Sequence, residues 1–521
     1  MTPAQWIGSM RALALACAAM ATPAWAEPAV ADPDPDPTVE STALTPAQAY
    51  EDFDLAVAAV EAALPDLYWH QSRRQWRRAK TAARAHLADA DDSADLYRQL
   101  RPLLSQVGEG HMSLQRTAAM KRSERAATRM LPIDIHWNEA VGADPARREE
   151  TRAYVIAGYG DAATIAPGTR LLAIDGEPVT KLIEELTGAL GRDGRNLTAA
   201  MREGEGRGYA QVRNRMRDAQ ASYRLSLMSA DGRVEERVVD AIAYDARPMP
   251  ADEQTSPVAT LEWLDARTAY MSVPSFSNKA YKRAGADFHG TIQGLFDQLR
   301  QRGARDLILD LRRNGGGSEP NESILYSYLM QAPLHKYAAV EARAARLDVT
   351  SASGKRFAMQ VFDEEDLAQQ RALGNGRYTR LNRPPEGLMT HWTVSAPVYR
   401  GRLVVLVGGR TFSGGAELAS MLRHVRRGVL VGEEVGGAHH GNTSGYEWRI
   451  ELPNSRMTLL VPLLQFRMNW PALPSGGGVR PACAVPPEVA ELDVTRDRAW
   501  RTAVALLGQS WRRPQQARCP P

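Results

Sequence analysis

Ser413 lies where an apolar segment ends and a helix is predicted to begin. The segment GRLVVLVGG (401–409) precedes RTFSGGAELASML (410–422). A hydroxyl at a helix N-terminus lies beside backbone N–H groups that can stabilise an oxyanion, so this position suits a nucleophile. Serine is also a favoured N-cap residue. Taken alone, Ser413 is therefore predicted to be a helix cap more readily than a nucleophile.

A second glycine-rich turn follows another predicted buried strand. RDLILDLR (305–312) leads into Asn314 and three glycines, 315–317. Active groups collect at the carboxyl ends of parallel strands, and glycines let the backbone approach a ligand and present N–H groups. The two turns together indicate a nucleophile and an oxyanion site. Thr411 breaks the G-x-S-x-G pattern, and Pro320 interrupts G-x-G-x-x-G, so no dinucleotide site is predicted.

A nucleophilic serine needs a base. No lysine follows Lys355, so a Ser-Lys dyad close in sequence is not available. Three of the ten histidines are predicted to be solvated or packed: His86, His136 and His424. His111, in the turn GEGH, and the pair His439 and His440, in a glycine-rich loop, remain candidates. Their spacing alone does not choose between them.

The elements that position these residues fall into regions of different pattern. Residues 46–120 have apolar residues at helical spacing, 121–250 read as short strands and hairpins, and strand–helix alternation begins near 258. Such alternation predicts an α/β core with parallel strands. The predicted organisation comprises a signal peptide (1–26), a disordered leader (27–45), a helical domain (46–120), a β-rich domain (121–250), the α/β core (251–490) and a C-terminal helix and tail (491–521).

Composition and charge limit the partners. The 521 residues are 44% hydrophobic and 24% charged, with a net charge of +3 spread along the chain, so nucleic-acid binding is not predicted. The apolar run ALALACAAMA follows Arg11, and Ala24-Trp25-Ala26 offers a cleavage site, which predicts a periplasmic or secreted protein without a membrane span. The sequence before Cys17 fits a lipobox poorly. In an oxidising compartment, Cys483 and Cys519 are expected to form a disulfide.

Several stretches resemble peptidase family S41, the C-terminal-processing and tricorn-core serine peptidases. The similar stretches, which together span about 46–490, are TAYMSVPSF (268–276), RDLILDLRRNGGG (305–317), RTFSGGAELA (410–419), VLVGEEVGG (429–437), ELPNSRMTLLVP (451–462) and GVRP (478–481). The resemblance implies a ClpP/crotonase-like α/β catalytic core with a helical N-terminal domain. It also implies that the region around IAPGTRLLAIDGEPV (165–179) is a PDZ-like domain, a type that holds peptide chains.

The resemblance assigns roles by position. Ser413 corresponds to the nucleophile. Ala438 stands where the Ser-Lys branch has its lysine, whereas GEGHMSL (108–114) is similar to the motif that supplies the base in the His-dependent branch, which makes His111 the base. The oxyanion donors would be the N–H groups of Gly414 and of Gly316 or a neighbouring glycine.

One position departs from the family pattern. The His-dependent branch has a glutamate just before G-V-x-P, where Ser475 is the nearest residue of this chain. No Asp or Glu occurs from Leu452 to Pro487. The group that would orient the His111 ring is therefore sought in Ser475 or in more distant carboxylates, namely Glu433, Glu434 and Glu451. A poorly oriented imidazole would lower the rate sharply.

These observations predict an exported serine endopeptidase that acts on protein or peptide substrates. Neither a cofactor nor a metal is predicted, since H-E-x-x-H is absent and two thiols are too few for a cysteine zinc site. Two alternatives belong to other classes. The missing glutamate favours a non-catalytic protein that binds peptides or hydrophobic ligands on the same fold. An acyl-CoA enzyme of the crotonase type would share the core, but export argues against it.

Overall fold

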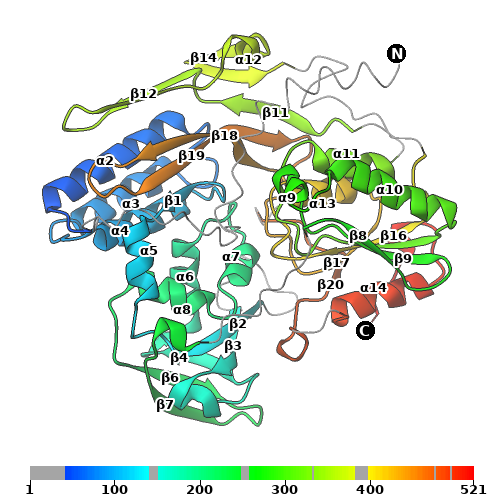
Figure 1. Cartoon of the computed structure of the whole chain (residues 1–521), viewed down its shortest axis with the longest axis horizontal. Helices are drawn as coiled ribbons and strands as arrows, with labels where there is room; N and C mark the ends of the chain where they lie inside the picture. The colour runs from blue at the N-terminus through cyan, green and yellow to red at the C-terminus, as the bar shows by residue number, and fades with distance from the viewer. Residues whose placement is uncertain are drawn as a thin grey trace.

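The structure is a computed structural model that describes residues 42–139, 151–247, 257–330, 334–381, 397–473, 477–492 and 496–520. The predicted signal peptide and nearly all of the predicted leader lie outside the described residues, as does Ser475. Figure 1 shows three bodies: N-terminal helices beside a long hairpin, a β-rich body, and an α/β body near the C-terminus.

The α/β body is built on a six-stranded sheet in the order β20-β17-β16-β10-β9-β8. All neighbouring pairs are parallel except β8 with β9. The strands are β8 (Thr260–Trp263), β9 (Thr268–Ser272), β10 (Asp306–Asp310), β16 (Arg402–Val407), β17 (Val429–Gly432) and β20 (Cys483–Ala484). Every residue of β10 is buried, as expected for a central parallel strand covered on both faces. The predicted α/β fold is confirmed.

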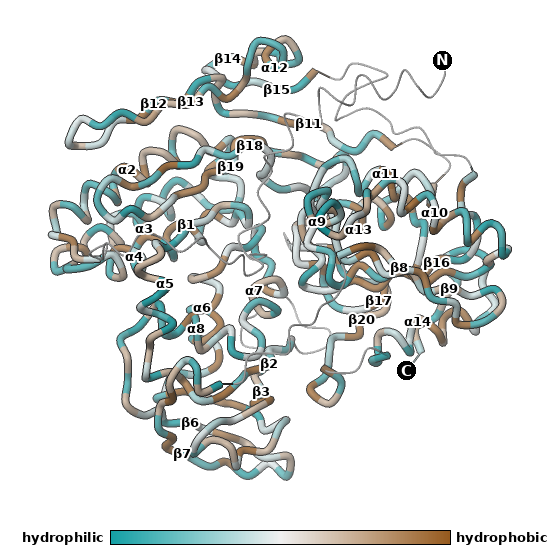
Figure 2. The backbone as a smooth tube through the Cα atoms, viewed as in Figure 1, coloured by the Kyte–Doolittle hydropathy of each residue, from teal (hydrophilic) through white to brown (hydrophobic). Residues whose placement is uncertain are grey.

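Helices cover both faces of this sheet because its side chains alternate in direction. Leu307, Leu309 and Val405 pack with three helices: α10 (Phe288–Gln301), α11 (Asn321–Leu329) and α13 (Gly414–His424). Ile308 and Val404 face α14 (Arg498–Gly508) on the other side. Figure 2 shows apolar residues along β16 and β17. A disulfide joins Cys483 of β20 to Cys519 beyond α14, as predicted.

A second sheet has the order β1-β19-β11-β15-β14, with β18 also paired to β19. Its strands are β1 (Ser113–Gln115), β11 (Tyr337–Ala342), β14 (Gln370–Gly374), β15 (Arg377–Arg380), β18 (Gly441–Glu451) and β19 (Thr458–Met468). It shares a hydrophobic core with α2 (Pro46–Ala63), α3 (Arg73–Ala85) and α4 (Ser93–Gln106). A separate pair, β12 (Arg346–Thr350) and β13 (Arg356–Gln360), packs on α2. The N-terminal helices and the hairpin formed by β18 and β19 therefore share one hydrophobic core.

The β-rich body has its own core and a sheet in the order β2-β3-β4-β6-β7. Its strands are β2 (Ile133–Glu139), β3 (Thr151–Gly158), β4 (Arg170–Ile174), β5 (Glu177–Pro178), β6 (Ser222–Met228) and β7 (Val234–Asp240). Its helices are α6 (Val179–Ala189), α7 (Thr198–Glu203) and α8 (Gly208–Met216). The predicted hairpin around 230–232 joins β6 and β7. The short helices elsewhere are α5 (Ala118–Arg125), α9 (Asn278–Arg283) and α12 (Glu364–Ala368). Among the described helices, none has the length and apolar character needed to cross a membrane.

Candidate active site

Ser413 occupies a strained turn between β16 and α13. Its backbone has φ 49° and ψ −126°, a conformation that residues other than glycine rarely adopt. The turn is held by Thr411, whose hydroxyl donates to the Leu311 carbonyl (2.7 Å), and by the Phe412 N–H, which donates to the Asn314 carbonyl (3.0 Å). Ser413 stands at the N-cap position, but its side chain makes no capping hydrogen bond. Its hydroxyl is therefore directed by something other than the helix.

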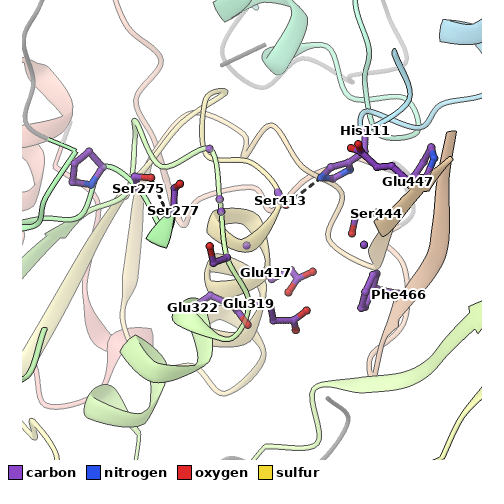
Figure 3. Close-up of a pocket in the computed structure, with 18 of the residues that line it drawn as sticks. His111, Ser275, Ser277, Glu319, Glu322, Ser413, Glu417, Ser444, Glu447 and Phe466 are labelled. Atoms are coloured by element: carbon purple, nitrogen blue, oxygen red, sulfur yellow. Dashed lines mark hydrogen bonds between the residues drawn. The ribbon is translucent and has the colours of Figure 1, made fainter. Parts of the chain in front are cut away.

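His111 lies opposite this hydroxyl, although it is 302 residues away in the sequence. The distance from its Nε2 to the Ser413 Oγ is 3.1 Å (Figure 3). The short strand β1 holds it there, since Ser113 pairs with Leu460 of β19 just after the histidine. The ring also packs against Phe412, with 5.1 Å between ring centroids. Of the histidines that the sequence left open, the structure brings His111 to Ser413.

The other two candidates are engaged elsewhere. His439 Nδ1 lies 3.2 Å from the Ser420 hydroxyl, and its ring packs against Trp470. His440 makes edge contacts with Trp69 and His70.

Burial favours the neutral imidazole of His111. It lowers the pKa of this histidine to about 4, against a smaller opposing effect of the Glu417 charge. A general base must be unprotonated, and this group is so above its pKa. Consequently the final loss of serine reactivity on acidification is expected near pH 4. Rates of labelling by a fluorophosphonate between pH 8 and pH 3.5 measure it, and a final loss near pH 6.5 would contradict this assignment.

Nδ1, the second nitrogen of the same ring, has no orienting group among the described residues. His111 Nδ1 is buried and has no hydrogen-bond partner among the described residues. Glu434, a predicted candidate, instead accepts from the Gly478 N–H (2.8 Å). Glu433 accepts from the Gly409 N–H (2.8 Å), and Glu451 pairs with Arg456 (2.6 Å). None of the three carboxylates orients His111, because each is already used to hold a loop or a neighbouring arginine.

The glycine loop after β10 lies against the serine. A side chain at Gly316 would put its Cβ 2.6 Å from the Ser413 Cβ, and Gly316 has φ 94°, so both space and backbone favour glycine. Its N–H, however, donates to Asn314 Oδ1 (2.9 Å) and so does not point freely at a ligand. Gly414 is the first residue of α13, where an N–H has no acceptor within the helix. A second oxyanion donor is better sought in Gly315 or Gly317, which line the same cavity.

The cavity beside Ser413 has a volume of about 190 Å³. His111 and the glycine loop line one part of it, and Glu319, Glu322 and Glu417 form an acidic side (Figure 3). The three carboxylates surround a lysine that the sequence analysis did not single out. Lys336 has no exposed surface, and its Nζ lies 2.9 Å from Glu319, 2.6 Å from Glu322 and 2.6 Å from Glu417.

The charges of this group depend on each other. Burial raises the pKa of Glu319 to about 7, even though Lys336 opposes that rise. Burial also disfavours the charge of Lys336, but the surrounding carboxylates outweigh it and hold the lysine pKa well above its usual value. Lys336 therefore stays charged and occupies the centre of the three carboxylates.

Comparison with known proteins finds a family match over part of the chain. Residues 267–458 match the model of peptidase family S41. This stretch contains Ser413 and the glycine loop after β10, but not His111. A serine and a histidine within hydrogen-bond reach beside a cavity have the arrangement that a nucleophile and its base require. Residues 267–458 are therefore similar to peptidase family S41.

Solved structures show the same fold over most of the chain. The crystal structure of mature CPAF is 13% identical, with a TM-score of 0.59 over 89% of this chain and 96% of that chain. The structure of mature CPAF complexed with lactacystin gives 13% identity and a TM-score of 0.58 over 86% of this chain and 95% of the other. At such identity the likeness concerns the fold. No curated protein sequence matches the chain.

Proposed function

We propose that this protein is an exported serine endopeptidase in which Ser413 is the nucleophile and His111 the general base. The observation that carries the proposal is the 3.1 Å approach of His111 Nε2 to the hydroxyl of a serine held at positive φ beside a cavity. Nucleophile and base must lie within hydrogen-bond reach, and a strained backbone at such a turn is typical of functional positions.

The reaction follows from these positions. Ser413 Oγ attacks the carbonyl carbon of the scissile peptide bond as His111 Nε2 accepts the hydroxyl proton. The Gly414 N–H and a glycine of the 315–317 loop stabilise the oxyanion. The C–N bond breaks when His111 returns the proton to the leaving amine, which leaves an ester on Ser413. Water then attacks this ester as His111 accepts one of its protons. The acyl C–O bond to Ser413 breaks, His111 returns the proton to Ser413 Oγ, and the acyl group leaves as a carboxylic acid.

A covalent probe tests the nucleophile directly. The mature protein is incubated with a fluorophosphonate at pH 8, and the modified peptide is identified by mass spectrometry. A single adduct on Ser413, together with digestion of casein into internal fragments, would support an endopeptidase. An adduct on another serine would overturn the assignment. Release of terminal residues only would retain a serine peptidase but not an endopeptidase.

Export is proposed from the sequence and from the disulfide. The segment before Glu27 has the features of a signal peptide, and the Cys483–Cys519 disulfide is of a kind that persists outside the cytosol. N-terminal sequencing of the protein recovered outside the cytoplasm should begin at Glu27. A chain that keeps its first 26 residues and remains in the cytoplasm would contradict export.

One observation favours a second function, a binding protein on the same fold. His111 Nδ1 has no partner among the described residues, and an imidazole without an orienting group is a weaker base. Complete failure of a well-folded wild-type protein to react with the probe, together with saturable binding of peptides in the cavity, would support this alternative.

A further inference from the structure

A loop of the β-rich body reaches the residue next to His111. It follows α6 and comprises residues 190–197. The Gly194 N–H donates to the Gly108 carbonyl (2.9 Å), and Asp193 Oδ1 accepts from the Gly110 N–H (2.9 Å). The other carboxylate oxygen, Oδ2, accepts from the Ala438 N–H (3.2 Å). One side chain from the β-rich body therefore connects the loop that carries His111 with the loop that follows β17.

Asp193 is well suited to this position chemically. It is 2% exposed, and an ionised carboxylate offers two acceptor oxygens and no donor, so it can satisfy two N–H groups at once. Asp193 packs closely against the backbone of Gly110, the residue before His111. A Cβ at Gly110 would lie 2.8 Å from Asp193 Oδ1 and 2.5 Å from the Phe412 ring. The backbone beside His111 is thus held between Asp193 and the aromatic ring that precedes Ser413.

We propose that Asp193 is a positioning residue that holds the His111 loop in its reactive geometry, an inference that rests on the proposed function. The imidazole has no partner at Nδ1 among the described residues, so its placement depends on its backbone and on packing against Phe412. A displacement of about 1 Å in an active site can lower a rate by about 10²-fold. Reactivity of Ser413 therefore depends on docking of the β-rich body through this carboxylate.

The residue that follows this loop provides a matched control. Thr198, at the start of α7, donates from its hydroxyl to the Glu434 carbonyl (3.0 Å). This bond docks the β-rich body on the α/β body without touching the His111 loop. Thr198→Val removes it, together with the bond from the same hydroxyl to Asn196 Oδ1 (2.8 Å), with little change in shape. Asp193→Asn instead replaces one of two acceptor oxygens with an amide donor, so the N–H of either Gly110 or Ala438 loses its acceptor. General loosening of the body would affect both variants.

Saturation kinetics of fluorophosphonate labelling at pH 8 separate positioning from binding. Burial raises the pKa of Asp193 to about 6, so the carboxylate is ionised at this pH. In the full-length Asp193→Asn protein, the limiting labelling rate constant is expected to fall about 10- to 100-fold. The half-saturating probe concentration should stay within twofold. In Thr198→Val both should stay within twofold of wild type, and thermal unfolding confirms that each variant is folded.

A second measurement needs no substitution. Protonation of Asp193 in the wild type also removes an acceptor, so the limiting rate constant should show a step near pH 6, above the final loss near pH 4. The charged groups that face Asp193 are Glu109 of the His111 loop and Glu417 of α13, and Arg101 of α4 lies near the adjacent Gly191. Asp193→Asn should lose the step near pH 6.

Four results would count against the inference. They are an unchanged limiting rate in Asp193→Asn, an equal loss in Thr198→Val, a change confined to half-saturation, and a wild-type profile without the step. If Asp193→Asn does not fold, the wild-type pH profile decides. A wild-type protein that takes no label would instead refute the proposed function, so the two failures are distinguishable.

Discussion

Ser413→Ala is expected to abolish fluorophosphonate labelling and to lower the rate of casein cleavage by on the order of 10⁶-fold, as found when the nucleophile of a serine peptidase is removed. The reason is that no other hydroxyl takes the place of Oγ at 3.1 Å from His111 among the described contacts. The variant should remain folded, because the Ser413 hydroxyl makes no capping bond whose loss would weaken α13.

His111→Ala should lose about 10²- to 10⁴-fold in the same assay, the usual contribution of a general base. The double variant should be no slower than Ser413→Ala, since the base acts through the nucleophile. His439→Asn is the matched control, because that histidine is buried and contacts Ser420 rather than Ser413. Loss of activity in His439→Asn with retention in His111→Ala would reverse the assignment of the base.

Lys336→Met is expected to cost about 3–5 kcal/mol of the free energy of unfolding. The lysine has no exposed surface and is the cation among three carboxylates whose oxygens lie within 4.8 Å of one another. Without it, these carboxylates are left buried and unpaired with a cation, in a wall of the cavity beside Ser413. Urea unfolding at pH 8 measures the loss.

Lys80→Met is the control for this prediction, because its ion pair with Glu61 is partly exposed and should contribute at most about 1 kcal/mol. The deficit of Lys336→Met should also shrink at lower pH. Buried carboxylates without a cation have folded-state pKa values above their unfolded ones, so the stability they contribute is present at low pH and lost as pH rises. Equal losses in the two lysine variants, or a deficit independent of pH, would contradict the explanation.

The sequence predicted those parts of the site that carry a local pattern. Buried strands followed by glycine turns indicated the α/β core, Ser413 and the 315–317 loop. His111 came from the resemblance of a short motif, and spacing alone could not separate it from His439 and His440. His111 was harder to predict than Ser413 because it depends on the pairing of β1 with β19, two segments far apart in the sequence. Such a pairing produces no repeating pattern in either segment.

Other features could not be predicted because they depend on contacts between distant segments. Lys336 lies in the region 334–381, where the sequence analysis described no individual element, and its partners come from α11, α13 and the turn before α11. Asp193 lies in the ordinary turn GRDGRN of another body. The sequence also suggested Gly316 as an oxyanion donor, but hydrogen bonding to Asn314 becomes visible only when the turn is folded.

The three-residue strand β1 also sets when reactivity can arise during synthesis. A ribosome makes the N-terminal part of a chain first, so His111 emerges 302 residues before Ser413. The partner of β1 is β19, which ends only at Met468. The base and nucleophile of the proposed site therefore cannot come together in the nascent chain until most of translation is complete.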